Sequence, residues 1–264
     1  VPLVTKQLIT TDEVTAATFR VPEVDVYNQI VADLKEGLNS SLPNFQPTAG
    51  IGRVSKAALN AYLGKVYLTM AATLPNNKAE NLSNANTYLM AAYNMKTFGN
   101  LAEIPYTDVF DVAKKTTCKE LIFQISYKQG DVNYSSSIAA NNQAKGETIN
   151  SLKVATGIGG NVTLDLINEY EAADGRKDFS VKYANDPIVK DWFITKFRDA
   201  STGATLNGYG GNDWILMRYA DVILMLAEVN MLQGNDAVAI QYLDMVRTRA
   251  GMPSYAVSRT NATY

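Results

Sequence analysis

Apolar residues recur at helical spacing over three stretches of the N-terminal part of the chain. This period places them on one face of a helix, so residues 22–38, 55–73 and 85–97 are predicted to be helices. Pro22 suits the first turn of the first helix. Small residues form a second row in the middle helix, which lets a neighbouring helix approach closely, as stacked helical hairpins require. This row comprises Ala57, Ala61 and Gly64.

The limits of the third predicted helix follow from residues with known preferences for helix ends. Ser83 or Asn84 is expected to cap its start, because a short polar side chain accepts a hydrogen bond from the first turn. Gly99 is expected to end it in a left-handed conformation.

A helical hairpin is predicted near the C-terminus. Its first arm covers residues 214–232, and its second arm covers residues 236–250. Gly234 is expected to end the first arm and Asn235 to cap the second. Gly251 follows the second arm and favours its termination.

The pattern changes between residues 100 and 213, which form a loop-rich insertion between the helical segments. Short strands are predicted at 121–127 and 192–197, and a short helix at 163–172. The predicted fold is therefore mainly α, with TPR-like helical hairpins of an α-α superhelix at 22–99 and 214–252. Binding groups tend to lie on such loops.

The composition excludes several kinds of chemistry. The chain has no histidine and a single cysteine, Cys118, so triads based on histidine, histidine-ligated metals and internal disulfides are ruled out. The net charge of −2 offers no basic surface for nucleic acid. The glycine-rich stretch 157–160 lacks the remainder of a phosphate-binding motif and is interpreted as a flexible loop. We therefore expect a protein that is not an enzyme and holds no cofactor or metal.

Three charged residues lie close together on the predicted arm 214–232. As a catalytic pair, Asp221 and Glu228 would lie about 10 Å apart along the helix, which is marginal at best for glycoside hydrolysis. The structural interpretation is favoured: Arg218 pairs with Asp221, and Glu228 meets an arginine of the next helix. The arginines available there are Arg247 and Arg249.

Four aromatic residues are candidates for stacking on a sugar ring. Trp192 and Trp214 flank apolar runs and are expected to be core residues. Tyr134 and Tyr209 have polar or glycine neighbours and are the better candidates, with Asn133 as an amide that hydrogen-bonds to hydroxyl groups. The insertion is therefore the expected site of carbohydrate binding.

Several segments, in order along the chain, resemble the SusD/RagB family. The segment 214–228 contains Arg-Tyr-Ala-Asp-Val followed by Ala-Glu, which is similar to the signature helix of that family. The segment 246–253 resembles its Val-Arg-x-Arg-Ala-Gly ending. The stretches 52–68, 120–123 and 170–176 also match the family pattern.

The resemblance implies a single SusD-like domain over residues 1–264 of a nutrient-binding lipoprotein of Bacteroidetes-type bacteria. Such proteins are lipid-anchored on the extracellular face of the outer membrane. They capture an oligosaccharide and pass it to a SusC-like TonB-dependent transporter, on which they act as a lid. The sequence has neither an export signal nor a lipid-bearing cysteine at its start, so we expect a precursor that is longer at both ends. Contact with the membrane is then expected only through that anchor.

Two other functions remain open at this point. Helical repeats commonly bind proteins or peptides, so a TPR-like scaffold for such a partner is the main alternative. Some RagB-like proteins are associated with peptides, which leaves the ligand class open even within the family. A glycosidase is a weaker possibility, because a convincing carboxylate pair is missing.

Overall fold

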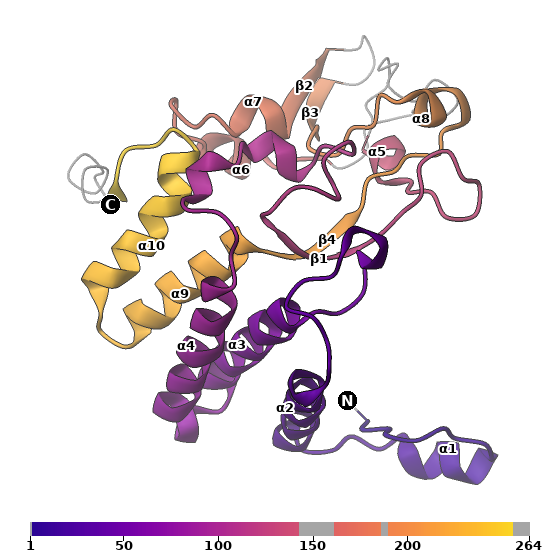
Figure 1. Cartoon of the computed structure of the whole chain (residues 1–264), viewed down its shortest axis with the longest axis vertical. Coiled ribbons are helices and arrows are strands. Elements are labelled where there is room, and N and C mark those ends of the chain that lie inside the picture. The colour runs from indigo at the N-terminus through magenta and orange to yellow at the C-terminus, as the bar shows by residue number, and fades with distance from the viewer. Residues whose placement is uncertain (1, 143–160, 186–189, 256–264) are drawn as a thin grey trace.

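The computed structural model describes residues 2–142, 161–185 and 190–255, and the described chain is mainly helical (Figure 1). The predicted glycine-rich loop at 157–160 lies outside the described residues. Long helices fill the lower part of the view in Figure 1, and the described residues of the insertion (100–142, 161–185 and 190–213) lie in its middle and upper parts.

Five helices pack side by side and form what we call the helical base. In their spatial order, they are α2 (Glu23–Asn39), α3 (Lys56–Thr73), α4 (Lys78–Asn94), α9 (Tyr219–Leu232) and α10 (Asp236–Arg249). Helix α4 packs against α9 although the whole insertion separates them in the sequence. The base is an array of helical hairpins, so the predicted mainly α, TPR-like fold is confirmed.

Helix α3 shows how the sequence builds this array. Ser55 caps its start by accepting a hydrogen bond from the backbone N–H of Ala58 at 3.3 Å. The predicted row of small residues is buried, and α4 lies so close that a Cβ added to Gly64 would lie 2.4 Å from Cγ of Leu89. Glycine is thus needed at this position for the close approach of the two helices.

Helix α4 begins earlier than predicted. Ser83 and Asn84 lie inside it and cap nothing, because Leu82 extends the buried face toward the N-terminus of the helix. A 3-10 turn at Pro75–Asn77 leads directly into the helix. The helix ends at Asn94, and Gly99 does not adopt a left-handed conformation.

The first arm of the C-terminal hairpin is part strand and part helix. Residues Trp214–Arg218 form β4, which pairs antiparallel with β1 (Leu121–Ile125), so the prediction of a helix from residue 214 was wrong. Helix α9 begins at Tyr219, since the backbone N–H of Arg218 donates to Asp221 Oδ2 at 3.0 Å and caps the first turn. The turn at Gly234 and the second arm were predicted correctly, although the Asn235 side chain makes no capping bond.

The remaining elements are short. Helix α6 and strand β3 correspond to the predicted helix at 163–172 and the predicted strand at 192–197, and β3 pairs antiparallel with β2. The short elements are α1 (Thr11–Ala17), η1 (Thr48–Gly50), η3 (Leu101–Glu103), η4 (Tyr106–Val109), α5 (Ile138–Asn141), α6 (Leu164–Glu169), α7 (Lys177–Ser180), β2 (Val181–Asn185), β3 (Lys190–Ile194) and α8 (Thr202–Asn207). None of the helices in the described ranges has the length and apolar character needed to cross a membrane.

Candidate ligand-binding cleft

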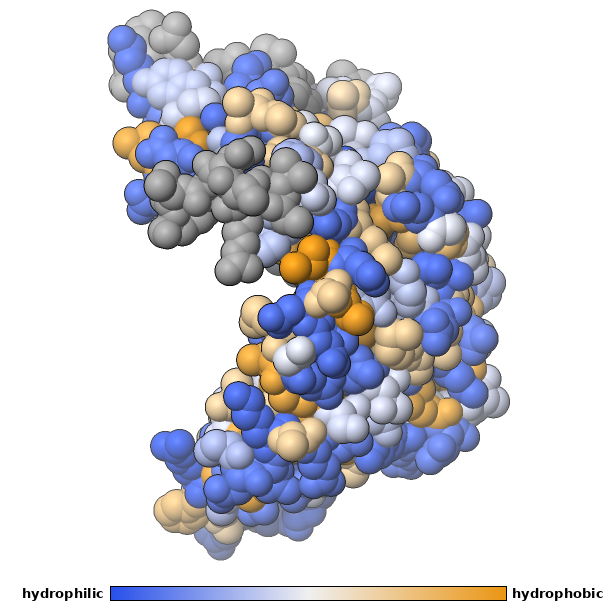
Figure 2. Space-filling view, turned by 90° about the vertical axis from the view of Figure 1, so that its left-hand side faces the viewer, coloured by the Kyte–Doolittle hydropathy of each residue, from blue (hydrophilic) through white to orange (hydrophobic). Residues whose placement is uncertain are grey.

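The molecule is hollowed on one side between the insertion and the helical base (Figure 2). A cleft of about 510 Å³ lies between these two parts, a volume typical of small-molecule sites. Helices α3 and α9 supply one side of it, and Phe110, strand β4 and the end of the segment after β3 supply the other. Its lining comprises Lys65, Phe110, Lys196, Phe197, Ile215, Leu216, Met217, Arg218, Asp221, Leu224, Met225 and Glu228.

An aromatic pair lies at the edge of this cleft. Trp214 stacks on Phe197, with ring centroids 6.2 Å apart and planes inclined by 18°. Trp214 is 47% exposed, so the prediction that it is a core residue was wrong. Its place at the start of β4, opposite the exposed Ile125, leaves the side chain half-exposed. By contrast, Trp192 is half-buried against Tyr183, in an edge-to-face contact at 5.6 Å.

A buried carboxylate connects the insertion to the helical base behind the cleft. Glu120, fully buried just before β1, accepts a hydrogen bond from Arg218 Nη1 at 2.9 Å and also pairs with Arg249 of α10. Arg249 lies over the ring of Tyr106, 5.4 Å from its centroid. An ion pair of this kind is costly to break, because removing one partner leaves a buried charge without compensation.

The charged residues of the predicted hairpin are only partly arranged as expected. Arg218 lies 3.7 Å from Asp221, as predicted. The prediction that Glu228 meets an arginine of the next helix was wrong, because Arg249 pairs with Glu120 and Arg247 with Glu171. Glu228 is exposed and lines the cleft instead.

Buried polar anchors fix the segment that carries Trp214. Asp213 accepts hydrogen bonds from Lys115 Nζ at 2.9 Å and from Gln124 Nε2 at 2.8 Å. Burial alone would raise the pKa of nearby Asp199, but hydrogen bonds from Gln129, Ser201 and Gly211 outweigh it and hold this pKa below its usual range. Both carboxylates are therefore structural anchors of this segment.

The three predicted ligand-binding residues lie away from this cleft. Tyr134 is 68% exposed, and Asn133 beside it is exposed as well. The structure brings the segments of Tyr134 and Tyr209 together: the backbone N–H of Gly130 donates to the Tyr209 carbonyl at 2.9 Å, and Ser136 bridges to Gly210. Two candidate tyrosines thus lie on adjoining segments of one surface.

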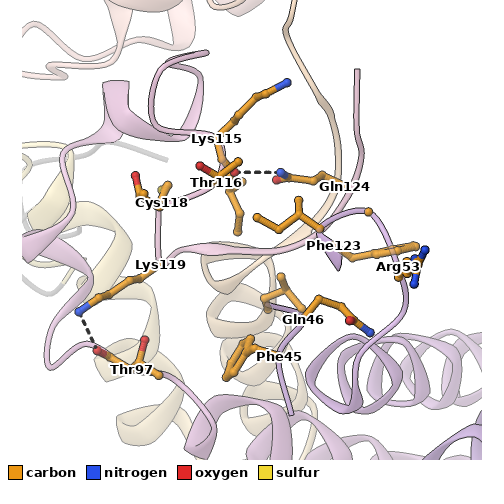
Figure 3. Close-up of a pocket in the computed structure, with 15 residues that line it drawn as sticks. Phe45, Gln46, Arg53, Thr97, Lys115, Thr116, Cys118, Lys119, Phe123 and Gln124 are labelled. Atoms are coloured by element: carbon orange, nitrogen blue, oxygen red, sulfur yellow. Dashed lines mark hydrogen bonds between the residues drawn. The ribbon is translucent and has the colours of Figure 1, made fainter. Parts of the chain in front are cut away.

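A second, smaller cavity of about 250 Å³ lies between the loop before α3, strand β1 and the segment 115–119 (Figure 3). Its lysines already have partners: Lys115 binds Asp213, and Lys119 donates to the carbonyl of Thr97, another residue of the lining, at 3.4 Å (Figure 3). Burial raises the pKa of the Cys118 thiol in its wall, which lowers the fraction of reactive thiolate. This cavity is a weaker candidate for ligand binding than the larger cleft.

Comparisons with known proteins place this geometry in context. Residues 185–263 match the model of the SusD family. The fold is similar to that of surface glycan-binding protein A from Bacteroides uniformis (TM-score 0.73, 19% identity, 97% of this chain and 55% of that chain covered). A SusD superfamily protein from Parabacteroides distasonis is also similar (TM-score 0.71, 21% identity, 89% and 52% covered). A comparison with curated proteins gives no match.

A further similar structure contains a ligand. Surface glycan-binding protein A from Bacteroides thetaiotaomicron, in complex with laminarihexaose, has a TM-score of 0.67 and 18% identity, with 87% of this chain and 54% of that chain covered. This chain therefore spans about half the length of the structures it matches. The fold is thus similar to that of SusD-superfamily proteins, and residues 185–263 match the model of that family.

Proposed function

We propose that the chain binds an oligosaccharide at the surface of the cell and holds it in the cleft between the insertion and the helical base. The observation that carries the proposal is the half-exposed Trp214 ring, stacked on Phe197 at the edge of a cleft of about 510 Å³. A flat aromatic face suits the C–H face of a pyranose, and the charged side chains of the cleft suit its hydroxyl groups. The similar protein solved with laminarihexaose supports a glycan as the ligand class.

We further propose that the full protein passes its ligand to a SusC-like TonB-dependent transporter, as its lid, and is lipid-anchored on the outer membrane. The match of residues 185–263 to the model of the SusD family supports this assignment. The same match supports a binding role without catalysis. Cross-linking of the full protein on intact cells, followed by identification of the linked membrane protein, tests the partner.

Titration calorimetry against a panel of neutral and acidic oligosaccharides tests glycan binding. Stacking and a few hydroxyl contacts on an open surface correspond to a dissociation constant of roughly millimolar to micromolar. Trp214→Ala is expected to weaken binding about tenfold, because it removes the stacking face. Unchanged circular dichroism would show that the variant is folded.

The predicted tyrosines define a competing location on the insertion. If the glycan binds there, Tyr134→Ala and Tyr209→Ala will weaken binding, and Trp214→Ala will leave it unchanged. Surface truncations of this kind normally change stability by less than about 0.5 kcal/mol, so folding serves as an internal control. The three variants together therefore locate the ligand.

Peptide binding is the second candidate, and one observation favours it. Leu216, Leu224 and Met225 give the cleft an apolar lining beside charges of both signs, which suits an extended peptide as well as a sugar. A peptide library screened in the same calorimetric format separates the two. Peptide binding without binding of any oligosaccharide would overturn the proposed function.

A further inference from the structure

Lys196 is a cation of the cleft that lies apart from the carboxylates. Lys196 Nζ lies 5.6 Å from the ring centroid of Phe110 and 5.8 Å from that of Tyr106. Within the described residues, no carboxylate lies within 4.0 Å of it, and it lines the cleft. Contact with aromatic faces holds an ammonium group in place without neutralising its positive charge.

The other charges of the cleft lie on or beside the helical base. Arg218 is committed to Glu120 and Asp221, and Lys65 on α3 shares that side with Glu228 on α9. On the opposite side, the described lining residues other than Lys196 and Arg218 are apolar or aromatic: Phe110, Phe197, Ile215, Leu216 and Met217. Since Arg218 is paired with carboxylates, Lys196 is the one described cation on this side of the cleft without a carboxylate within 4.0 Å.

The aromatic pair lies next to this charge in the chain. Phe197 follows Lys196 directly in the chain, lines the same cleft and carries the Trp214 ring. A pyranose that stacks on the edge of this pair would lie in the same cleft as the ammonium group. A neutral hexose offers a hydroxymethyl group there, whereas a uronic acid offers a carboxylate, which forms a charge-assisted hydrogen bond of about twice the strength.

We propose that the cleft selects acidic oligosaccharides and that Lys196 Nζ receives the carboxylate of a uronic acid residue. This inference rests on the proposed glycan-binding function and adds the charge of the ligand to it. Lys196 is thus the specificity-determining residue, and the Phe197–Trp214 pair supplies affinity that is independent of charge.

The test uses uronate-containing oligosaccharides on an array, each beside its carboxyl-reduced form, which is a neutral sugar with the same linkages. The unmodified protein is expected to prefer the acidic form about ten- to a hundredfold, in the range of a hydrogen bond to a charged group. Calorimetry on the best pair measures the ratio. Raising the salt concentration is expected to shrink it, because screening weakens the attraction.

Three variants test the role of Lys196. Lys196→Gln is expected to bring the ratio of acidic to neutral affinity close to one, and Lys196→Arg to keep most of it. Lys182→Gln is the matched control, since Lys182 is an exposed lysine on β2 outside the cleft lining. Thermal melting followed by circular dichroism verifies that each variant is folded.

The outcomes separate the two proposals. If acidic and reduced forms bind equally well and Trp214→Ala weakens both, glycan binding stands and selection by Lys196 is overturned. An acid preference that survives in Lys196→Gln also overturns it. If no oligosaccharide binds, whatever its charge, both proposals fail together.

Discussion

The helical base and the insertion are held together by different physics. The base packs apolar and small side chains between neighbouring helices, and its large buried residues include Leu63, Leu89 and Leu226. The insertion combines small apolar clusters with buried carboxylates that bind backbone and side-chain donors, such as Asp199 and Asp213. Apolar packing holds extended contact faces, whereas polar anchors fix individual loop positions. The cleft lies where these two regions meet.

The largest effect is expected where one charge joins the two regions. Glu120→Ala removes the shared partner of Arg218 and Arg249, and the Arg249 side chain is only 4% exposed. Leaving such a charge unpaired costs about 3–5 kcal/mol of unfolding free energy. Urea unfolding monitored by far-UV circular dichroism measures it. Glu228→Ala is the matched control, with an expected change of less than about 0.5 kcal/mol; equal effects of the two would contradict a junction at Glu120.

A smaller loss is expected inside the helical base. Gly64→Ala introduces a Cβ that would lie 2.4 Å from Cγ of Leu89, so α3 and α4 must separate or repack. Overpacking of this kind costs about 1–3 kcal/mol. Alanine is the better helix former by about 1 kcal/mol, so a gain in stability would show that the helices tolerate the methyl group. Thermal unfolding shows whether the variant is less or more stable than the unmodified protein.

A still smaller loss of stability is expected for a substitution at the start of α9. Asp221→Ala removes the acceptor for the backbone N–H of Arg218 and one carboxylate near its guanidinium. Loss of a helix cap costs about 1 kcal/mol, so the melting temperature should fall by a few degrees. Unchanged stability together with lost ligand binding would instead make Asp221 a ligand contact.

Acid is expected to affect the insertion before the base. Burial alone would raise the pKa of Asp174, but its bonds to Arg176 hold that pKa below the usual range, as hydrogen bonds do for Asp199. A lowered folded-state pKa stabilises fully above the ordinary value of about 3.9, and this contribution is lost as the pH falls through the folded-state pKa. Amide NMR signals of residues 161–213 should therefore shift or broaden first, with those of α3 and α9 following at lower pH. If the signals of both regions change at the same pH, the insertion and the helical base unfold as one cooperative unit.

The sequence predicted the elements whose burial follows a helical period. Helix α3 agrees with the prediction almost to the residue, because its apolar stripe and its small-residue row both follow a helical period. Helix α4 shows the limit of such reasoning: polar residues at its start lie on the solvent side of a helix that Leu82 already anchors. Local residue preferences predict a cap at Ser83 or Asn84, but tertiary packing extends the helix beyond them toward its N-terminus.

Strand β4 could not be recognised from local pattern. Its apolar run leads without a break into α9, and only pairing with β1, distant in sequence, makes it a strand. The same non-local pairing explains why Trp214 was assigned to the core. A tryptophan beside apolar residues is predicted to be buried, but the position of Trp214 at the start of the strand leaves it half-exposed.

The cleft was harder to predict than the fold. Phe110, Phe197 and α9 come from separate parts of the chain, and no spacing in the sequence indicates that they meet. The exposure of Tyr134 was anticipated from its polar neighbours, and its role in binding stays a prediction.

The place of Trp214 also gives the protein an optical reporter of its own. The chain has two tryptophans, and Trp192 lies against Tyr183 outside the cleft lining. In a Trp192→Phe variant, all indole emission would come from the half-exposed ring at the edge of the cleft. A ligand that covers this ring would displace water from it, shift its emission to shorter wavelength and shield it from quenching by iodide. Occupancy of the cleft could then be followed in real time without a label.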